Sequence, residues 1–129
     1  GTWVRAATLR IEVLGLLDGL VQDVVIAGQD KADIGLLVFP LPDAIDGTTG
    51  DVIDAPELAG QVAGRLRDAA RHAGSSTRIA RVLLMAEPPS VKDGEITPKG
   101  SLNPRKILTR RAALFQRLYD DADPAVIRI

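Results

Sequence analysis

The chain contains 129 residues, of which 46% are hydrophobic and 26% are charged. This length and composition are typical of one folded domain with one core, and they exclude a disordered chain. Sixteen Lys and Arg residues against 17 Asp and Glu give a net charge of −1, so bulk charge does not direct the molecule to nucleic acid. The lack of cysteine and the single histidine exclude a disulfide framework, a thiolate nucleophile and a Cys- or His-rich metal centre.

Two further signals are missing from the sequence. No apolar stretch approaches the roughly 20 residues that span a bilayer, and no secretory signal opens the chain. We therefore expect a soluble, cytoplasmic protein with no membrane partner. Because Gly1 stands where an initiator methionine would be, we also expect the chain to be part of a longer protein.

The first half of the chain predicts a strand, a helix and a hairpin. Residues 2–4 are typical of a short strand, and apolar residues at three- and four-residue spacing predict an amphipathic helix over residues 9–20. Residues 21–27 and 34–39 are rich in β-branched and apolar side chains, and the Gly- and Asp-containing segment between them favours a reversal, so they should pair as a hairpin. Residues 40–54, rich in Pro, Gly and Asp, are expected to form an exposed loop.

The second half predicts two helices around another strand. A helix begins near Asp54, a plausible N-cap, and ends before Gly74. Residues 78–85 are expected to form a central strand, residues 93–100 a turn, and residues 104–119 a closing helix. The expected fold is an α/β (α+β) two-layer sandwich, in which a small mixed three-stranded sheet with a short hairpin is covered on one face by about three helices.

Positive charge gathers near the end of the chain. Residues 97–118 contain six cations and no acid, a field that would attract a phosphate-rich ligand such as a nucleotide or coenzyme A. The alternative is that this is only a solvated helix face, which is the more common case. Lys99 lies in a Pro- and Gly-bounded loop, where it could meet a phosphate or could simply be solvated. Trp3, the sole tryptophan, could pack in the core or form the lip of a ligand site.

Three segments of the sequence resemble a known enzyme superfamily. They are GTWV with the elements that follow it, VQDVVIAGQDKADIGLLVFP over residues 21–40, and GEITPKGSLNPRKILTRRAALFQRLYDD over residues 94–121. With these segments the chain resembles the C-terminal domain of the adenylate-forming acyl-CoA synthetases, luciferases and peptide synthetases, with the feruloyl-CoA synthetase branch most similar. The last segment resembles the closing motif of the superfamily, an E-[IL]-T-P turn that runs into a basic helix.

The resemblance implies that residues 1–129 are a single domain, the mobile C-terminal domain of a larger ligase whose N-terminal domain would be its partner. Such an enzyme would activate an aryl carboxylate, such as a hydroxycinnamate, as an acyl-adenylate and then form the thioester with coenzyme A as substrate. ATP and Mg²⁺ would be bound mainly by the N-terminal domain. The isolated C-terminal domain is accordingly expected to be inactive.

The resemblance also implies two groups of site residues. A lysine of the closing motif would stabilise adenylation, and we assign that role to Lys99, although Ser101 stands at the place usual for the lysine. The opposite face, with Gly1, Thr2, Trp3 and Val4, would serve the thioester-forming step. The alternative function is a free-standing regulatory module that binds a nucleotide or another protein through the basic helix. The sequence upstream of this chain would separate the two hypotheses.

Overall fold

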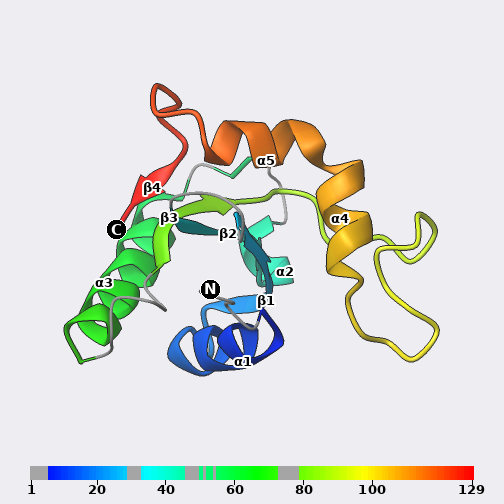
Figure 1. Ribbon diagram of the computed structural model, residues 1–129, viewed down its shortest axis with the longest axis horizontal. Helices are drawn as coiled ribbons and strands as arrows, with labels where there is room; N and C mark the ends of the chain where they lie inside the picture. Colours follow the sequence, from blue (N-terminus) through cyan, green and yellow to red (C-terminus); the bar gives the residue numbers. More distant parts are fainter. Residues whose placement is uncertain (1–5, 29–32, 46–49, 51, 54, 73–78) are drawn as a thin grey trace.

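The computed structural model describes residues 6–28, 33–45, 50, 52–53, 55–72 and 79–129. Its centre is a four-stranded sheet in the order β1-β2-β3-β4 (Figure 1). The strands are β1 (Val21–Ala27), β2 (Ile34–Pro40), β3 (Ile79–Leu84) and β4 (Ile127–Arg128). β1 and β2 form an antiparallel hairpin, β3 runs parallel to β2, and β4 pairs antiparallel with β3, so the sheet is mixed.

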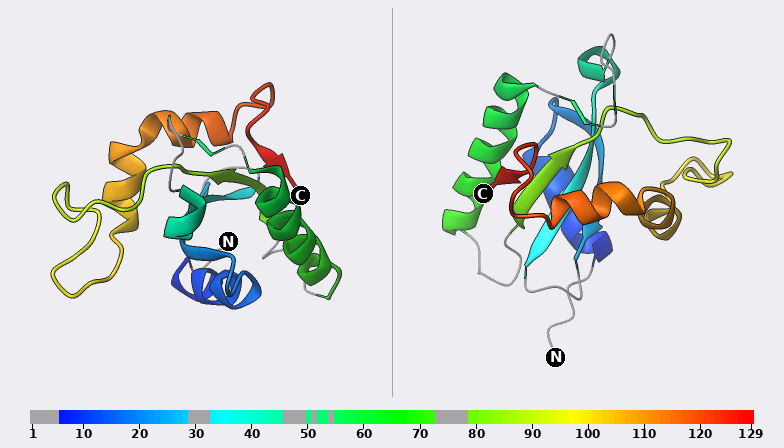
Figure 2. Two further views of the ribbon diagram at one scale, coloured as in Figure 1. Left: turned by 180° about the vertical axis from the view of Figure 1, so that it is seen from behind. Right: turned by 90° about the horizontal axis from the view of Figure 1, so that it is seen from above.

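Helices pack against both faces of this sheet. α1 (Ala6–Leu16) and α3 (Pro56–His72) cover one face, whereas α4 (Pro104–Arg110) and α5 (Ala112–Leu118) cover the other (Figures 1 and 2). The short helix α2 (Pro42–Ile45) follows β2. Among the residues that the structure describes, no helix is both long and apolar enough to cross a membrane.

The central strand shows why two helical layers are needed. All seven residues of β2 are buried, and its side chains alternate between two apolar cores. Leu36 and Val38 face the core beneath α1 and α3, whereas Leu37 and Phe39 face the core beneath α4 and α5. A strand buried on both faces has a continuous apolar sequence, and IGLLVF is such a sequence.

The structure confirms the α/β class with a small mixed sheet, and most of the predicted elements. The β1–β2 hairpin, the strand expected over residues 78–85 (β3) and the long helix α3 are present, with ends within a few residues of those expected. The first predicted helix is also present, although α1 ends earlier than expected, at Leu16. Residues 2–4, predicted to be a strand, lie outside the described residues.

Four expectations need correction. The helices cover both faces of the sheet rather than one, because β1, β2 and β3 each bury side chains on two faces. A fourth strand, β4, is present, but its two residues are too few to show a pattern. The stretch 40–54, expected to be loop, contains α2. The single closing helix predicted over 104–119 is two helices, separated at Arg111.

Candidate functional site

The segment between β3 and α4 extends away from the sheet and carries Lys99 (Figures 1 and 2). We call residues 95–103 the lysine hairpin. Ile96 and Leu102 form an antiparallel bridge across it. At the tip, the amide of Gly100 donates to the carbonyl of Thr97 at 2.8 Å, and the amide of Thr97 donates to the carbonyl of Ser101 at 2.8 Å. Lys99 therefore stands in a closed turn, and its side chain is exposed.

The residues of the tip match the geometry of this turn. Pro98 supplies a φ angle suited to the second position of a turn. Gly100 has a φ of +86°, a left-handed conformation that glycine adopts without steric cost. The hydroxyls of Thr97 and Ser101 lie 2.9 Å apart and share a hydrogen bond. Ser101 thus takes part in closing the turn, and Lys99 is the cation that the tip presents.

A buried carboxylate holds the base of the lysine hairpin. Glu95 has 0% exposure, and its backbone accepts from the amide of Asn103, at the other end of the hairpin, at 2.8 Å. Its Oε1 accepts from the amide of Ser90 at 2.8 Å, and its Oε2 lies 2.9 Å from Nη1 of Arg110. The remaining partner is Arg111, which donates to both carboxylate oxygens, at 2.8 and 2.9 Å. The carboxylate is therefore fully paired, as a buried charge requires.

Arg111 connects this carboxylate to the segment that precedes the hairpin. It is 6% exposed, and all three of its guanidinium nitrogens donate. Besides Glu95, the acceptors are the carbonyl of Glu87 at 2.9 Å and the carbonyl of Pro88 at 3.0 Å. The guanidinium carbon also lies 4.9 Å from the ring centre of Phe39 in β2, which is cation–π distance. One side chain thus ties the base of the hairpin to the central strand.

The protonation state of Glu95 follows from these contacts. Burial by itself would raise the pKa of the Glu95 carboxyl. The hydrogen bonds from Arg111 and from the amide of Ser90, together with the nearby arginine charges, outweigh burial and hold that pKa below the ordinary value. Glu95 is therefore ionised at neutral pH, and the cluster is a true ion pair.

The structure separates the cations of residues 97–118 into two groups. Arg110 and Arg111 pair with Glu95, and Arg117 pairs with Asp123 at 2.7 Å. These three charges are neutralised within the domain. The other cations are exposed, and no carboxylate in the described part of the chain forms an ion pair with them: they are Lys99, Arg105 and Lys106. Three of the six cations that were expected to attract a ligand therefore form ion pairs within the domain.

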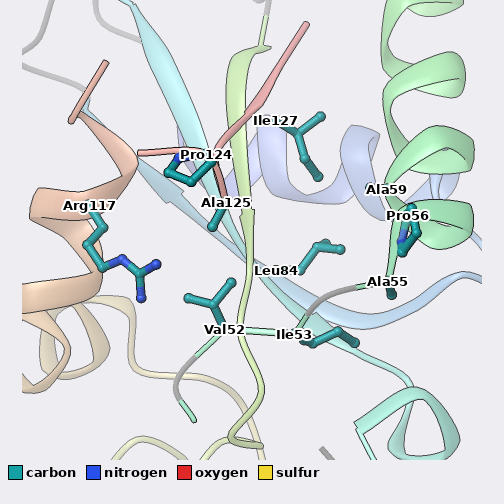
Figure 3. A pocket seen from close by; sticks show the side chains of 10 residues that line it. All are labelled: Val52, Ile53, Ala55, Pro56, Ala59, Leu84, Arg117, Pro124, Ala125 and Ile127. Atoms are coloured by element: carbon teal, nitrogen blue, oxygen red, sulfur yellow. The ribbon is translucent and has the colours of Figure 1, made fainter. Parts of the chain in front are cut away.

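A separate hollow lies between the start of α3, the end of α5 and the segment that leads into β4. Its volume is about 490 Å³. Figure 3 shows apolar side chains around it, among them Leu84 at the end of β3 and Ile127 in β4, with Arg117 at one side. The hydrogen bond from Arg117 to Asp123 lowers the pKa of that carboxyl, so the cation at this hollow is already paired. None of the lining residues belongs to the lysine hairpin.

A metal site would need several ligating side chains close together. Within the described ranges, no three His, Cys, Asp or Glu side chains gather in a group that could hold a metal ion. The acidic side chains at the base of the lysine hairpin are paired with arginine instead.

Comparison with known proteins identifies the domain. The family model described as the AMP-binding enzyme C-terminal domain matches residues 6–123. The chain belongs to that family. The match includes β1, β2, α3, the lysine hairpin, and the helices α4 and α5 that follow it. It confirms the resemblance to the adenylate-forming superfamily.

Solved structures confirm the fold of this AMP-binding C-terminal domain. One match is the A-PCP didomain of carboxylic acid reductase from Segniliparus rugosus in complex with AMP, with a TM-score of 0.68, 18% identity, and coverage of 90% of this chain and 16% of that chain. Another is the A domain of carboxylic acid reductase from the same organism, in complex with AMP and a co-purified carboxylic acid, with a TM-score of 0.62 and 18% identity. It covers 90% of this chain and 18% of that chain. No curated protein matches the sequence.

The sequence-predicted site residues have different outcomes. Lys99 is at an exposed hairpin tip, and Ser101 is beside it in the same turn. Gly1, Thr2, Trp3 and Val4 lie outside the described residues. Sequence reasoning missed Glu95 and Arg111 as the anchor of the hairpin. A signal was present, because Arg111 occupies the apolar face of the closing helix between Ile107 and Leu114, both of which are buried.

Proposed function

We propose that this chain is the C-terminal domain of an ATP-dependent acid:CoA ligase, in which Lys99 is the catalytic cation of the adenylation step. The observation that carries the proposal is an exposed lysine at the tip of a closed hairpin whose base is held by a buried ion pair. Family membership supports the use of ATP and the formation of an acyl-adenylate. The resemblance to feruloyl-CoA synthetases supports a hydroxycinnamate, such as ferulate, as the acid.

Lys99 would act where negative charge accumulates. In adenylation a carboxylate oxygen forms a bond to the α-phosphorus of ATP, and the bond from that phosphorus to the bridging oxygen of pyrophosphate breaks. Negative charge then increases on the phosphate oxygens between two anionic reactants. An ammonium group placed beside these oxygens stabilises the transition state, and its arrival on a closing domain also excludes water. Lys99 is exposed and unpaired with any described carboxylate, so its full charge is available.

The second step would use another face of the domain. The thiol sulfur of coenzyme A forms a bond to the acyl carbon, and the bond from that carbon to the AMP oxygen breaks. We propose that residues 1–4 face coenzyme A in this step, as the family resemblance implies. In the enzyme that contains this domain, Trp3→Ala should then slow thioester formation more than adenylation, whereas equal slowing of both steps would assign Trp3 to the core.

The large N-terminal domain of the proposed ligase would bind ATP, the acid and Mg²⁺. The present chain corresponds to only 16% and 18% of the length of the two reductase structures that it matches. Arg105 and Lys106, the other two cations of residues 97–118 without an ion-pair partner among the described carboxylates, follow the lysine hairpin in the first turn of α4 and would face the phosphates of ATP or coenzyme A.

A product assay on the enzyme that contains this domain tests the proposal. With ferulate, ATP, Mg²⁺ and coenzyme A, we expect pyrophosphate, AMP and the aromatic acyl thioester in equal amounts. A panel of benzoates, hydroxycinnamates and fatty acids should give the highest rate with hydroxycinnamates. Absence of carboxylate-dependent pyrophosphate release would contradict adenylation, whereas adenylation without the thioester would contradict the ligase assignment and leave only the family function.

A further inference from the structure

The lysine hairpin has little support apart from its base. Its tip is exposed, and Thr97 and Ser101 bond to each other rather than to the body of the domain. The hairpin contacts the body near its base, through Glu95, which is buried and hydrogen-bonded to Asn103 at 2.8 Å, and through Leu102, which packs against the core beneath α4 and α5. The orientation of Lys99 relative to the sheet is therefore set three to four residues away from it, on both sides of the hairpin.

Arg111 connects that base to two other segments of the domain. Its fork donates to both carboxylate oxygens of Glu95, and its other N–H groups donate to the carbonyls of Glu87 and Pro88. The guanidinium carbon lies over the ring of Phe39. The guanidinium group is planar and rigid, so contacts on its several sides fix angles as well as distances. Phe39 is a fully buried residue of β2, all of whose residues are buried. Arg111 thus connects the base of the hairpin to a strand in the interior of the fold.

We propose that Arg111 is a positioning residue for adenylation, which acts through Glu95 to hold Lys99 at its working place. This inference rests on the proposed function of Lys99. It goes beyond that function because it assigns a role in the reaction to a side chain buried under the sheet. A lysine at position 111 would still supply the positive charge opposite Glu95. It could not donate at once to two carboxylate oxygens and two carbonyls, as the planar guanidinium group does. An error of about 1 Å in the place of a catalytic group can cost about 100-fold in rate.

The test compares both half-reactions in the complete enzyme. Arg111→Lys keeps the positive charge beside Glu95 but loses the fork. We expect it to lower kcat for acyl-adenylate formation by about tenfold or more, with little change in KM for ATP or the acid. Conversion of a supplied acyl-adenylate to the thioester should stay within about threefold of the parent, because that step uses another face. This intact second step also shows that the variant is folded.

Arg10 provides the matched control. It too forms a bidentate pair with a carboxylate, that of Asp23, at 3.0 and 2.7 Å, but the pair joins α1 to β1 and not the hairpin. Arg10→Lys should therefore leave both half-reactions unchanged. Glu95→Gln provides the reciprocal test, since it keeps the size of the side chain and removes the charge that Arg111 grips. We expect it to slow adenylation selectively, as Arg111→Lys does.

A double variant decides between positioning and general stability. If Arg111 acts through Lys99, then Arg111→Lys should slow adenylation in the parent but add almost nothing in a Lys99→Ala background. Equal factors in both backgrounds, or equal slowing of both half-reactions, would overturn the inference and leave the role of Lys99 intact. If Lys99→Ala alone has no effect on adenylation, the proposed function of Lys99 fails, and this inference fails with it.

Discussion

Nε and Nη2 of Arg111 lie 2.8 and 2.9 Å from the two carboxylate oxygens of Glu95, although the two residues are 16 positions apart in the chain. The pair joins the break between α4 and α5 to the base of the lysine hairpin. A buried ion pair of this kind costs desolvation, so it adds little net stability relative to apolar residues, but its rupture leaves one charge uncompensated.

Removal of Arg111 should therefore destabilise the domain strongly. We expect Arg111→Ala to lower the free energy of unfolding by about 3 kcal/mol, because Glu95 would remain buried with only Arg110, a partly exposed side chain, as its ion-pair partner. Arg10→Ala breaks a pair whose side chains are 30% and 19% exposed, and should cost about 1 kcal/mol. Urea unfolding of the two variants measures both values, and a loss under about 1 kcal/mol for Arg111→Ala would show that the ion pair is not the anchor of the hairpin.

Acid should weaken the same anchor. Because the pKa of Glu95 is lowered in the folded state, its contribution to stability is complete above the unfolded value of 4.5 and is lost as pH falls through the lower folded value. Asp123, whose pKa is lowered by Arg117 and by the amide of Ala125, acts in the same direction. Unfolding free energies measured at neutral pH and at about pH 3 should differ less for Glu95→Gln than for the parent. An unchanged difference would contradict the lowered pKa of Glu95.

Gly28, at the end of β1, should tolerate no side chain. Its φ is +76°, and an added Cβ would overlap the hydroxyl of Tyr119, which donates to the carbonyl of Asp33 at 2.7 Å. We expect Gly28→Ala to lower the melting temperature and to cost more than about 2 kcal/mol, from backbone strain and from overpacking. Gly64→Ala is the control, because no atom lies within 4 Å of its added Cβ, and should stabilise α3 by about 0.5–1 kcal/mol.

The closing helix shows both the reach and the limit of sequence reasoning. The apolar spacing correctly places helical residues on both sides of position 111, and Ile107 and Leu114 are buried as the pattern requires. The break at Arg111 is not a local preference, because arginine is a good helix former. It coincides with the contacts to Glu95 and to the carbonyls of Glu87 and Pro88, which come from a distant segment. Only the charge on an apolar face hinted at them.

The sheet shows a similar limit. The apolar run of β2 predicts burial, but by itself it does not show that both faces of the sheet are covered; burial on both faces accounts for the absence of alternation. For the site, the turn chemistry around Lys99 was readable because Pro98 and Gly100 have strong local preferences. The burial of Glu95 could not be predicted from the sequence, because its arginine partner Arg111 lies 16 residues away in the chain.

The isolated chain should bind no acyl substrate productively. We expect residues 1–129 to fold but to release no pyrophosphate from ATP with ferulate, because the acid pocket and the phosphate-binding loop are proposed to lie on the N-terminal domain. The measurement is pyrophosphate release against a heat-denatured control. Turnover by the isolated chain would contradict the division of labour between the two domains.

The most direct test of the account is the adenylation rate of Lys99→Ala in the complete enzyme, with Lys92→Ala as the control. Lys92 is another exposed lysine of the segment between β3 and α4. Loss of one preorganised electrostatic contact should slow adenylation by about 10²–10³-fold, while a supplied acyl-adenylate is still converted to the thioester at nearly the parent rate. Lys92→Ala should change neither step. Adenylation by Lys99→Ala within about threefold of the parent would contradict the assignment and direct attention to Arg105 and Lys106.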